Sequence, residues 1–475
     1  LWVVLGAVFI GGVHDFSTLV ASVRHRGLSI GELVKQYISP RSYTFFLIFI
    51  WITLMYLIIT FVDITAQTFK AASGDEAYGP SVAAISLVYL LLAVLMGILL
   101  RTFKVRLSIL TAIFLPLLFV FIWLSTRLPD SVVAALSSLS ATEWSMILLA
   151  YCLIASVIPA WTLLQPRGYL GGWLLYLTIA ASFIGTCFGG FSIRYPALNM
   201  QGFNSLANGQ ALFPLLFITI ACGACSGFHG IVGSGTTSKQ LCKETDARPI
   251  GYGAMLLEGL VAIFAIVTVM ILSREDAALK ADPNMIYANG IAKYLGLLGI
   301  DPVFALTFAL LAFSTFVYDT LDVCTRLGRI IFQELIAWKG FLSNIVSTLV
   351  SLVFPLVFLL LAGEKGYLVA WPIFGTSNQL LAGFALMAVS FWLVRTHRNA
   401  LFTALPMAFM LTMTAWSLIL HIIPFYQALF SPGGGRALDA KVITSGTVGT
   451  ILLGLTILLA VEAARAFFLK KSARN

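Results

Sequence analysis

The stretch ITIACGACSGFHGIVGSGTTSKQL, residues 218–241, decides how the rest of this sequence is interpreted. Its first half is apolar enough for the core of a membrane helix, yet it carries five glycines, a histidine and a Ser-Gly-Thr-Thr run. Glycine disfavours helix because it loses more backbone freedom on folding than any other residue. We therefore expect a helix that is interrupted inside an apolar environment.

The composition indicates a membrane protein. Of 475 residues, 60% are hydrophobic and 10% are charged, and the mean hydropathy is +0.97. Soluble domains carry about 25% charged residues. The apolar runs are about 20 residues long, the length a helix needs to cross the hydrocarbon core, whereas barrel strands would alternate over about 10 residues. The sequence predicts an all-α protein that crosses the membrane many times.

Apolar runs predict about thirteen transmembrane helices. They cover 1–22, 43–68, 80–100, 107–125, 144–164, 171–190, 211–231, 250–272, 303–325, 341–362, 369–394, 400–423 and 445–468. After the first run, Ser29 and Glu32 have the spacing of a helix capping box, which predicts a short amphipathic helix at the membrane surface.

The net charge of +9 is explained by membrane orientation rather than by nucleic acid. No basic cluster is interleaved with aromatic residues, so we expect no nucleic-acid partner. When successive loops are assigned to alternate sides, most basic residues fall on the side that holds the C-terminal residues Arg465–Arg474. Basic loops are cytoplasmic. We therefore expect a cytoplasmic C-terminus.

Several ionisable residues lie within or at the edges of predicted spans, where a charge at mid-bilayer costs about 2.5–3.5 kcal/mol. Such groups usually face a cavity or a partner. Asp15 follows His14, and the alternative to a functional role is an ion pair with a neighbouring helix. Glu258 has no polar neighbour in sequence, so it is a candidate proton carrier, or else a neutral side chain bonded to backbone. His229 lies in the interrupted stretch.

A second acidic pair lies on one helix face. Thr315, Asp319, Asp322 and Arg326 follow helical spacing, and Asp322 is expected to pair with Arg326. Arg167 and Arg194 are both expected in loops. Asp63, near the end of its span, is expected to be solvated.

A second segment, WPIFGTSNQLLAG at 371–383, also predicts a broken helix because Pro372 removes an N–H and polar residues follow. Broken helices near the bilayer midplane are typical of substrate and ion sites in secondary transporters. The alternative for both segments is close packing through small residues. In the first segment the polar candidates are Ser234, Thr236 and Thr237, and in the second they are Asn378 and Gln379.

Motifs for other functions are missing from the sequence. We find no Walker A motif, no HExxH and no serine nucleophile elbow, so we expect neither an enzyme nor a bound cofactor. Cys222 and Cys225 have CxxC spacing, but small-residue packing explains it better than metal or redox chemistry.

Five blocks resemble the carbon starvation protein A (CstA) family in order and spacing: HDFSTLVASVRHRGLSIGELVKQ, residues 218–241, IGYGAMLLEGLVAI, DVCTRLGRIIFQ and WPIFGTSNQLLAGFAL. The resemblance implies a bacterial inner-membrane transporter that takes up peptides during carbon starvation, with relatives that are proton symporters for pyruvate. It also implies an APC/LeuT-like architecture. It divides the chain into a main region, 1–300, and a five-helix region, 303–475. Family members have about three further helices upstream, which are expected to be missing here.

Together these features predict a symporter for a small substrate, peptide or pyruvate, working by alternating access. Glu258 or Asp15 would exchange the coupling proton, although hydroxyls and glycine carbonyls near 234–237 would also suit sodium. A membrane sensor that binds the same ligands without accumulating them is the alternative, and the oligomeric state is left open. The predicted path consists of His14, Asp15, His229, Ser234, Thr236, Thr237, Glu258, Asp319, Asp322, Asn378 and Gln379.

Overall fold

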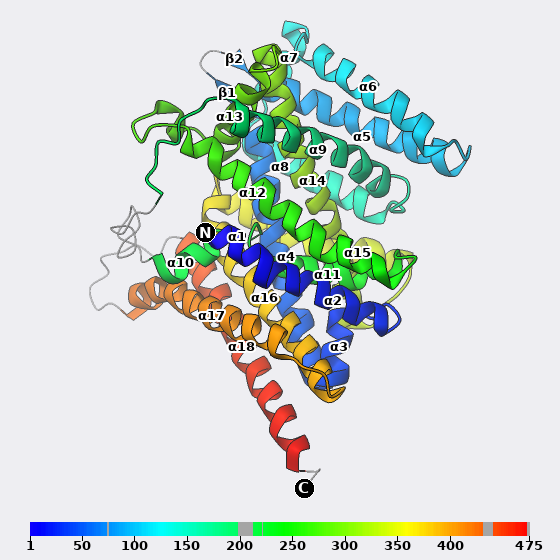
Figure 1. Cartoon of the computed structure of the whole chain (residues 1–475), viewed down its shortest axis with the longest axis vertical. Coiled ribbons are helices and arrows are strands. Elements are labelled where there is room, and N and C mark those ends of the chain that lie inside the picture. Colours follow the sequence, from blue (N-terminus) through cyan, green and yellow to red (C-terminus); the bar gives the residue numbers. More distant parts are fainter. Residues whose placement is uncertain (74–75, 198–211, 221, 431–439, 473–475) are drawn as a thin grey trace. The chain divides into compact units, whose positions relative to one another are not determined.

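The computed structural model describes residues 1–73, 76–197, 212–220, 222–430 and 440–472. Within them nearly all regular structure is helical (Figure 1). The one strand pair among the described residues is a hairpin of two residues on each side, β1 (Ala72–Ser73) and β2 (Glu76–Ala77). The expectation of an all-α membrane protein is confirmed apart from this small turn.

By length and composition, eleven helices of the described chain could cross a membrane, or up to twelve if a bent pair counts as one span. This is one or two fewer than the thirteen predicted spans. The run 211–231 is divided into two short helices, α10 (Leu212–Thr219) and α11 (Gly227–Gly235). The run 144–164 corresponds to α8 (Ala141–Val157), which is bent by 91° from α7 (Asp130–Ser137). Hydropathy alone predicts neither the division of 211–231 nor the bend between α7 and α8.

The chain forms two compact units, each assembled from separated stretches of sequence. Unit 1 comprises Leu1–Tyr56, Leu198–Ile263 and Leu368–Asn475, and unit 2 comprises Leu57–Ala197 and Phe264–Tyr367. This is a division by spatial contacts. The boundary between 1–300 and 303–475 describes family organisation and stays a prediction.

Unit 1 begins with one span, Trp2–Arg24, made of α1 (Trp2–Gly6), a π-helical turn (Ala7–Gly11) and α2 (Gly12–Arg24). A second π-helical turn (Arg248–Gly253) leads into α12 (Ala254–Met270). π-helical turns inside helices are frequent at functional sites. The other helices of unit 1 are α3 (Ile30–Tyr37), the first part of α4 (Pro40–Thr68), α10, α11, α16 (Tyr367–Arg395), α17 (Leu401–Phe430) and α18 (Ala440–Ser472), with short 3₁₀ turns at Thr237–Lys239 and Glu244–Asp246.

The predicted capping box of α3 is present. The Ser29 side chain accepts from the backbone N–H of Glu32, and the Glu32 carboxylate accepts from the backbone N–H of Ser29. The apolar face of α3 is covered by protein, because Ile30, Leu33 and Val34 are buried. The local sequence signal therefore gave this helix and its start correctly.

The second predicted break is wrong, because α16 is continuous through 371–383. Pro372 lies in the second turn, where it removes one backbone donor without ending the helix. The Thr376 hydroxyl donates to the Pro372 carbonyl at 2.8 Å, and the Ser377 hydroxyl donates to the Phe374 carbonyl at 3.1 Å. Two of the four polar side chains thus bond to their own helix.

Unit 2 is built around α14 (Pro302–Ile336), which packs against α8, α9, α13 and α15. Its other elements are the end of α4, the hairpin, the end of α12 and a 3₁₀ turn (Ala277–Lys280), together with α5 (Gly79–Arg101), α6 (Leu107–Ser125), α7, α8, α9 (Leu164–Phe188), α13 (Pro283–Gly296) and α15 (Phe341–Ala362).

Asp63, on α4, is buried rather than solvated as expected, with only 2% of its surface exposed. Its Oδ2 accepts from the backbone N–H of Tyr367 at 2.7 Å, and its Oδ1 accepts from Gln67 Nε2 at 3.2 Å. Tyr367 is the first residue of α16. Asp63 therefore caps a helix that begins 304 residues later in the chain.

We expect Asp63→Ala to lower the free energy of unfolding by about 1–2 kcal/mol, because an N-terminal helix donor loses its acceptor. Thermal unfolding of the purified protein in detergent measures this loss. The control is Lys365→Met, which breaks the exposed pair between Lys365 and Asp282; exposed pairs contribute about 0–1 kcal/mol. Equal stability of the two variants would contradict the capping role.

Candidate functional site

Helix α2 places a histidine and an aspartate side by side in the interior of unit 1. His14 is fully buried and Asp15 is 9% exposed. His14 Nδ1 lies 2.7 Å from Asp15 Oδ1. The side chains of Ser17 and Thr18, one turn on, donate to the His14 backbone carbonyl. The pair is therefore held within α2 itself.

Two further helices bring their titratable groups to Asp15. His229, on α11, lies with Nδ1 2.8 Å from Asp15 Oδ2. Its other ring nitrogen, Nε2, is 3.1 Å from Glu258 Oε2 on α12. Glu258 is thus paired, contrary to the expectation that it stands alone. We call His14, Asp15, His229 and Glu258 the acid–histidine chain.

The contacts limit the protonation states of this chain. When Asp15 is ionised it accepts at both oxygens, and both histidines then donate to it from Nδ1. The contact between His229 and Glu258 then needs one more proton, carried either by His229 as imidazolium or by Glu258 as carboxylic acid. The chain with this one shared proton has a net charge of −1 when His14 is neutral. One additional proton makes it neutral.

The predicted interruption of 218–241 is confirmed. Helix α10 ends at Thr219 and α11 begins at Gly227, and the described residues between them are not helical. Non-helical backbone at membrane depth must find partners in protein or line a cavity. Asn378 and Gln379 of α16 supply such partners. Both side chains are fully buried.

Each of these two amides contacts the interruption. Asn378 Oδ1 accepts from the backbone N–H of Phe228 at 2.9 Å, and its Nδ2 donates to the Ser226 hydroxyl at 3.1 Å. Gln379 Nε2 donates to the Ile220 carbonyl at 3.1 Å. The polar patch of α16 therefore satisfies the break in its neighbour instead of breaking its own helix.

Two of the glycines in 218–241 permit close approach of helices. A Cβ on Gly227 would overlap the Asn378 carbonyl and the Ala382 N–H of α16, and one on Gly230 would press on the His14 ring. A Cβ on Gly233 or Gly235 would meet open space. The glycines at the start of α11 thus set the distance from α11 to both α16 and α2.

The hydroxyl residues of α11 have different surroundings. Ser234 is fully buried, donates to the Gly230 carbonyl at 2.6 Å and accepts from the Ile30 N–H at 3.0 Å. It therefore joins α11 to the start of α3. Thr236 is exposed at the end of α11, and Thr237 is half-buried in the following 3₁₀ turn. Their roles in a transport path stay predictions.

Asp319 and Asp322 belong to a separate cluster in unit 2, where they bind Arg167. Arg167 Nε lies 2.7 Å from Asp319 Oδ1, and its Nη1 lies 2.5 Å from Asp322 Oδ2. The same Nη1 donates to the Tyr151 hydroxyl at 2.7 Å, and Tyr151 donates to Asp322 at 2.8 Å. This network, in which Arg167 and Asp322 are buried and Asp319 is half-buried, joins α9 and α8 to α14.

Two expectations about this cluster are wrong. Arg167 lies within α9 and is fully buried, not in a loop. Arg326 does not pair with Asp322; its Nη2 donates to the backbone carbonyls of Ala155 and Ile158 at 3.0 and 2.6 Å. A guanidinium on another helix presents a fork that two carboxylates can share, which a partner one turn away cannot match. Arg194 lies in an exposed loop segment, as expected.

The sequence profile described as carbon starvation protein CstA matches residues 1–287 and 273–417. The chain belongs to the CstA family. A peptide transporter CstA of Campylobacter jejuni is 30% identical over 492 residues, which cover 90% of this chain and 69% of that relative. A peptide transporter CstA of Helicobacter pylori is 28% identical over 489 residues, covering 89% and 70%. The pyruvate/proton symporter BtsT of Escherichia coli is 28% identical over 512 residues, covering 89% and 70%.

Family membership and the helical spans make the chain a multi-pass membrane transporter. The names of the relatives do not favour a sensor. Among solved structures, a manganese transporter of Eremococcus coleocola aligns with 98% of this chain and 95% of its own at 13% identity, with a TM-score of 0.33. A likeness of that size does not decide the architecture, so the APC/LeuT-like arrangement stays a prediction.

Metal chemistry has no support in the described residues of this CstA-family chain. Within them, no group of three or more His, Cys, Asp or Glu side chains is arranged to hold a metal ion. Cys222 and Cys225 are free thiols, and Cys225 packs with Ala382 and Met410 in an apolar cluster.

Sequence reasoning missed Arg167 and Tyr151 as members of the network around the two aspartates. A predicted span with an earlier start would have included Arg167, because α9 begins at Leu164 and not at residue 171. No local signal pairs Asn378 with Ser226, since the two residues are 152 positions apart.

We expect Gly227→Ala to prevent normal folding of this CstA-family protein, because the added methyl group would overlap backbone atoms of α16 and backbone is costly to shift. Gly233→Ala, in the same helix, should be tolerated or slightly stabilising, because alanine favours helix by about 1 kcal/mol over glycine. The yield of monodisperse protein on gel filtration distinguishes them. Similar yields would contradict the close approach of α11 and α16.

We expect Arg167→Met to lower the free energy of unfolding by about 3–5 kcal/mol, because the buried Asp322 and the half-buried Asp319 lose their partner. Adding Asp319→Asn and Asp322→Asn to Arg167→Met should recover most of the loss, since no unpaired charge then remains. Thermal unfolding of the three proteins tests this. A triple variant no more stable than Arg167→Met would show that the network does not depend on charge pairing.

Proposed function

We propose that this protein takes up a small substrate, a peptide or pyruvate, by proton symport across the bacterial inner membrane through alternating access. The proposal draws on the peptide and pyruvate/proton activities in the names of its relatives. It needs no cofactor and no nucleic-acid partner. The C-terminus is placed in the cytoplasm because the basic residues near it follow the positive-inside rule.

The observation that carries the proton role is the acid–histidine chain. Four titratable side chains from α2, α11 and α12 are linked through contacts of 2.7, 2.8 and 3.1 Å. Ionisable residues inside a membrane domain are costly, and linked series of acids and histidines are typical of proton relays. The interrupted segment joins this chain directly, because His229 lies in the first turn of α11.

The chain offers two places for the coupling proton. The side chains of His229 and Glu258 are 27% and 21% exposed, so these are the two groups of the chain through which a proton can enter. His14 Nε2, at the other end, is buried and has no hydrogen-bond partner in the described structure. A proton taken up at Glu258 removes the net negative charge and favours binding of an anionic carboxylate beside the break. Loss of the proton restores the repulsion and favours release.

Sodium is the alternative coupling ion. Its candidate ligands are the hydroxyls and glycine carbonyls near 234–237, and Ser234 Oγ is engaged with the Gly230 carbonyl and the Ile30 N–H. Thr236 is exposed at the helix end. These contacts favour the proton as the coupling ion.

We expect proteoliposomes containing the protein to accumulate labelled pyruvate or a labelled dipeptide when a proton gradient is directed inward. Glu258→Gln and Asp15→Asn should reduce gradient-driven accumulation to the level of protein-free vesicles, because neither amide can exchange the proton. Glu275→Gln, an exposed loop residue, should leave uptake unchanged and is the matched control.

Three other outcomes would change the proposal. Uptake by Glu258→Gln with the full pH dependence of the unmodified protein would exclude Glu258 as the proton carrier. Accumulation driven by a sodium gradient alone would replace the proton. Binding of either substrate without accumulation under any gradient would support the sensor.

A further inference from the structure

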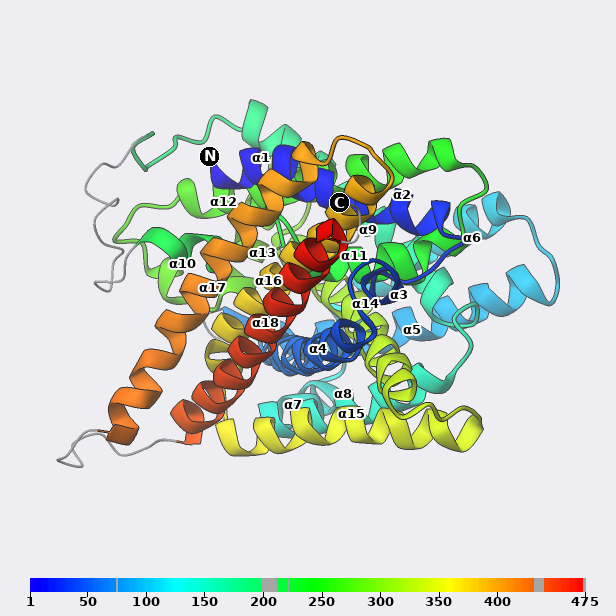
Figure 2. The same cartoon turned by 90° about the horizontal axis from the view of Figure 1, so that it is seen from below.

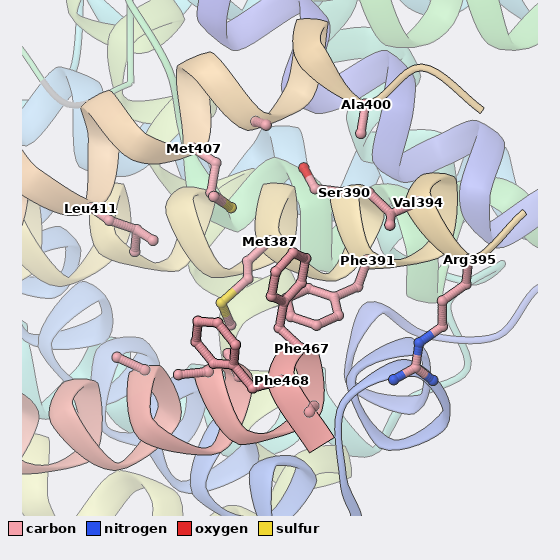
Figure 3. A pocket seen from close by; sticks show the side chains of 15 residues that line it. Met387, Ser390, Phe391, Val394, Arg395, Ala400, Met407, Leu411, Phe467 and Phe468 are labelled. Atoms are coloured by element: carbon pink, nitrogen blue, oxygen red, sulfur yellow. The ribbon is translucent and has the colours of Figure 1, made fainter. Parts of the chain in front are cut away.

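An apolar cavity of about 790 Å³ lies among three helices of unit 1, the end of α16, the start of α17 and the end of α18. Figure 3 shows Met387 and the rings of Phe391, Phe467 and Phe468 at its centre, with Leu411 near one end and Arg395 at the other. Its volume is in the range of small-molecule sites, about 300–1,000 Å³. α17 and α18 lie side by side in Figure 2.

The sequence creates this space with small residues. Four alanines of α18, at 460, 463, 464 and 466, line the cavity where larger side chains would fill it. Exposed apolar side chains form its edge: Val394 is 50% exposed and Phe468 is 67% exposed. In a membrane helix such exposed side chains face hydrocarbon. The cavity therefore opens toward the acyl chains of the bilayer.

Among the described residues that line the cavity, Arg395 is the one that carries a charge. Its guanidinium lies 5.9 Å from the Tyr37 ring, and its Nη2 is buried without a hydrogen-bond acceptor in the described structure. An unsatisfied charged donor is costly. Glu462, which precedes the cavity-lining Ala463 in α18, is engaged with Ser39 at 2.8 Å and with Arg465 at 3.2 Å. The Arg395 end of the cavity thus offers a charged donor to an anion.

We propose that this cavity binds an anionic phospholipid, with an acyl chain among the apolar side chains and the phosphate on Arg395. The occupant needs an anionic group for Arg395 and an apolar part for the rest of the cavity. An anionic phospholipid has both. Basic pockets between transmembrane helices are known binding sites for anionic headgroups. The lipid holds the end of α16 against α17 and α18. This site is separate from the acid–histidine chain and does not depend on the proposed transport function.

The test is titration of delipidated, full-length protein in detergent with phosphatidylglycerol or with phosphatidylcholine of the same acyl chains, followed by native mass spectrometry. Phosphatidylglycerol should bind about tenfold more tightly than phosphatidylcholine, as expected for one charge-assisted hydrogen bond. Arg395→Gln should remove this preference. Ala463→Trp, which fills the cavity, should abolish binding of both lipids at this site.

Two variants serve as matched controls. Arg398→Gln removes an exposed charge of the following loop, and Leu405→Trp adds an indole on α17, at a side chain that is 63% exposed; neither residue lines the cavity. Both should bind phosphatidylglycerol like the unmodified protein. Equal binding of the two lipids by unmodified protein, or the same loss in Arg398→Gln as in Arg395→Gln, would overturn the proposal. A lipid-free dimer that Ala463→Trp dissociates would identify a second copy as the occupant and would also overturn it.

Discussion

An interrupted helix inside a membrane protein exposes backbone N–H and C=O groups that hydrocarbon cannot satisfy. In unit 1 this constraint falls on the segment between α10 and α11. Asn378 and Gln379 meet it from α16 through hydrogen bonds to Phe228, Ser226 and Ile220. These amides are fully buried, so their own polar groups need partners as much as the broken backbone does. The Asn378 amide is bonded through both its oxygen and its nitrogen, and Gln379 is bonded through its nitrogen.

The interruption also determines where His229 lies. Because α11 starts at Gly227, its first turn can approach α16 through Gly227 and α2 through Gly230. That approach brings His229 between Asp15 and Glu258, which lie on helices that each follow a π-helical turn. A histidine between two carboxylates can share a proton with either of them. The proposed proton coupling rests on this arrangement of three helices around the break.

In unit 2 the charged side chains of the cluster around Arg167 pair with one another. Arg167 is fully buried and binds two aspartates and a tyrosine hydroxyl, so its donors are largely satisfied. A buried ion pair contributes little net stability, but removal of one partner is costly because the remaining charge is unpaired. Asp319 and Asp322 therefore join helices within unit 2 through Arg167, and their role in a transport path stays a prediction. The acid–histidine chain differs from this cluster. His14 Nε2 has no hydrogen-bond partner in the described structure and Glu258 is partly exposed, so both groups are available to further partners.

The sequence by itself determined the helical membrane class, most of the spans, the capping box at Ser29, the break in 218–241 and the identity of Asp15, His229 and Glu258 as unusual residues. These features depend on composition, on helical periodicity and on the cost of a charge or a glycine in a helix, all of which are local. Only the tertiary structure decided which groups meet. It paired Glu258 with His229 and Asp322 with Arg167, and it kept α16 continuous where a break was expected. The reason is that each of these outcomes depends on a partner more than 25 residues away, and local sequence carries no information about which distant helix will supply that partner.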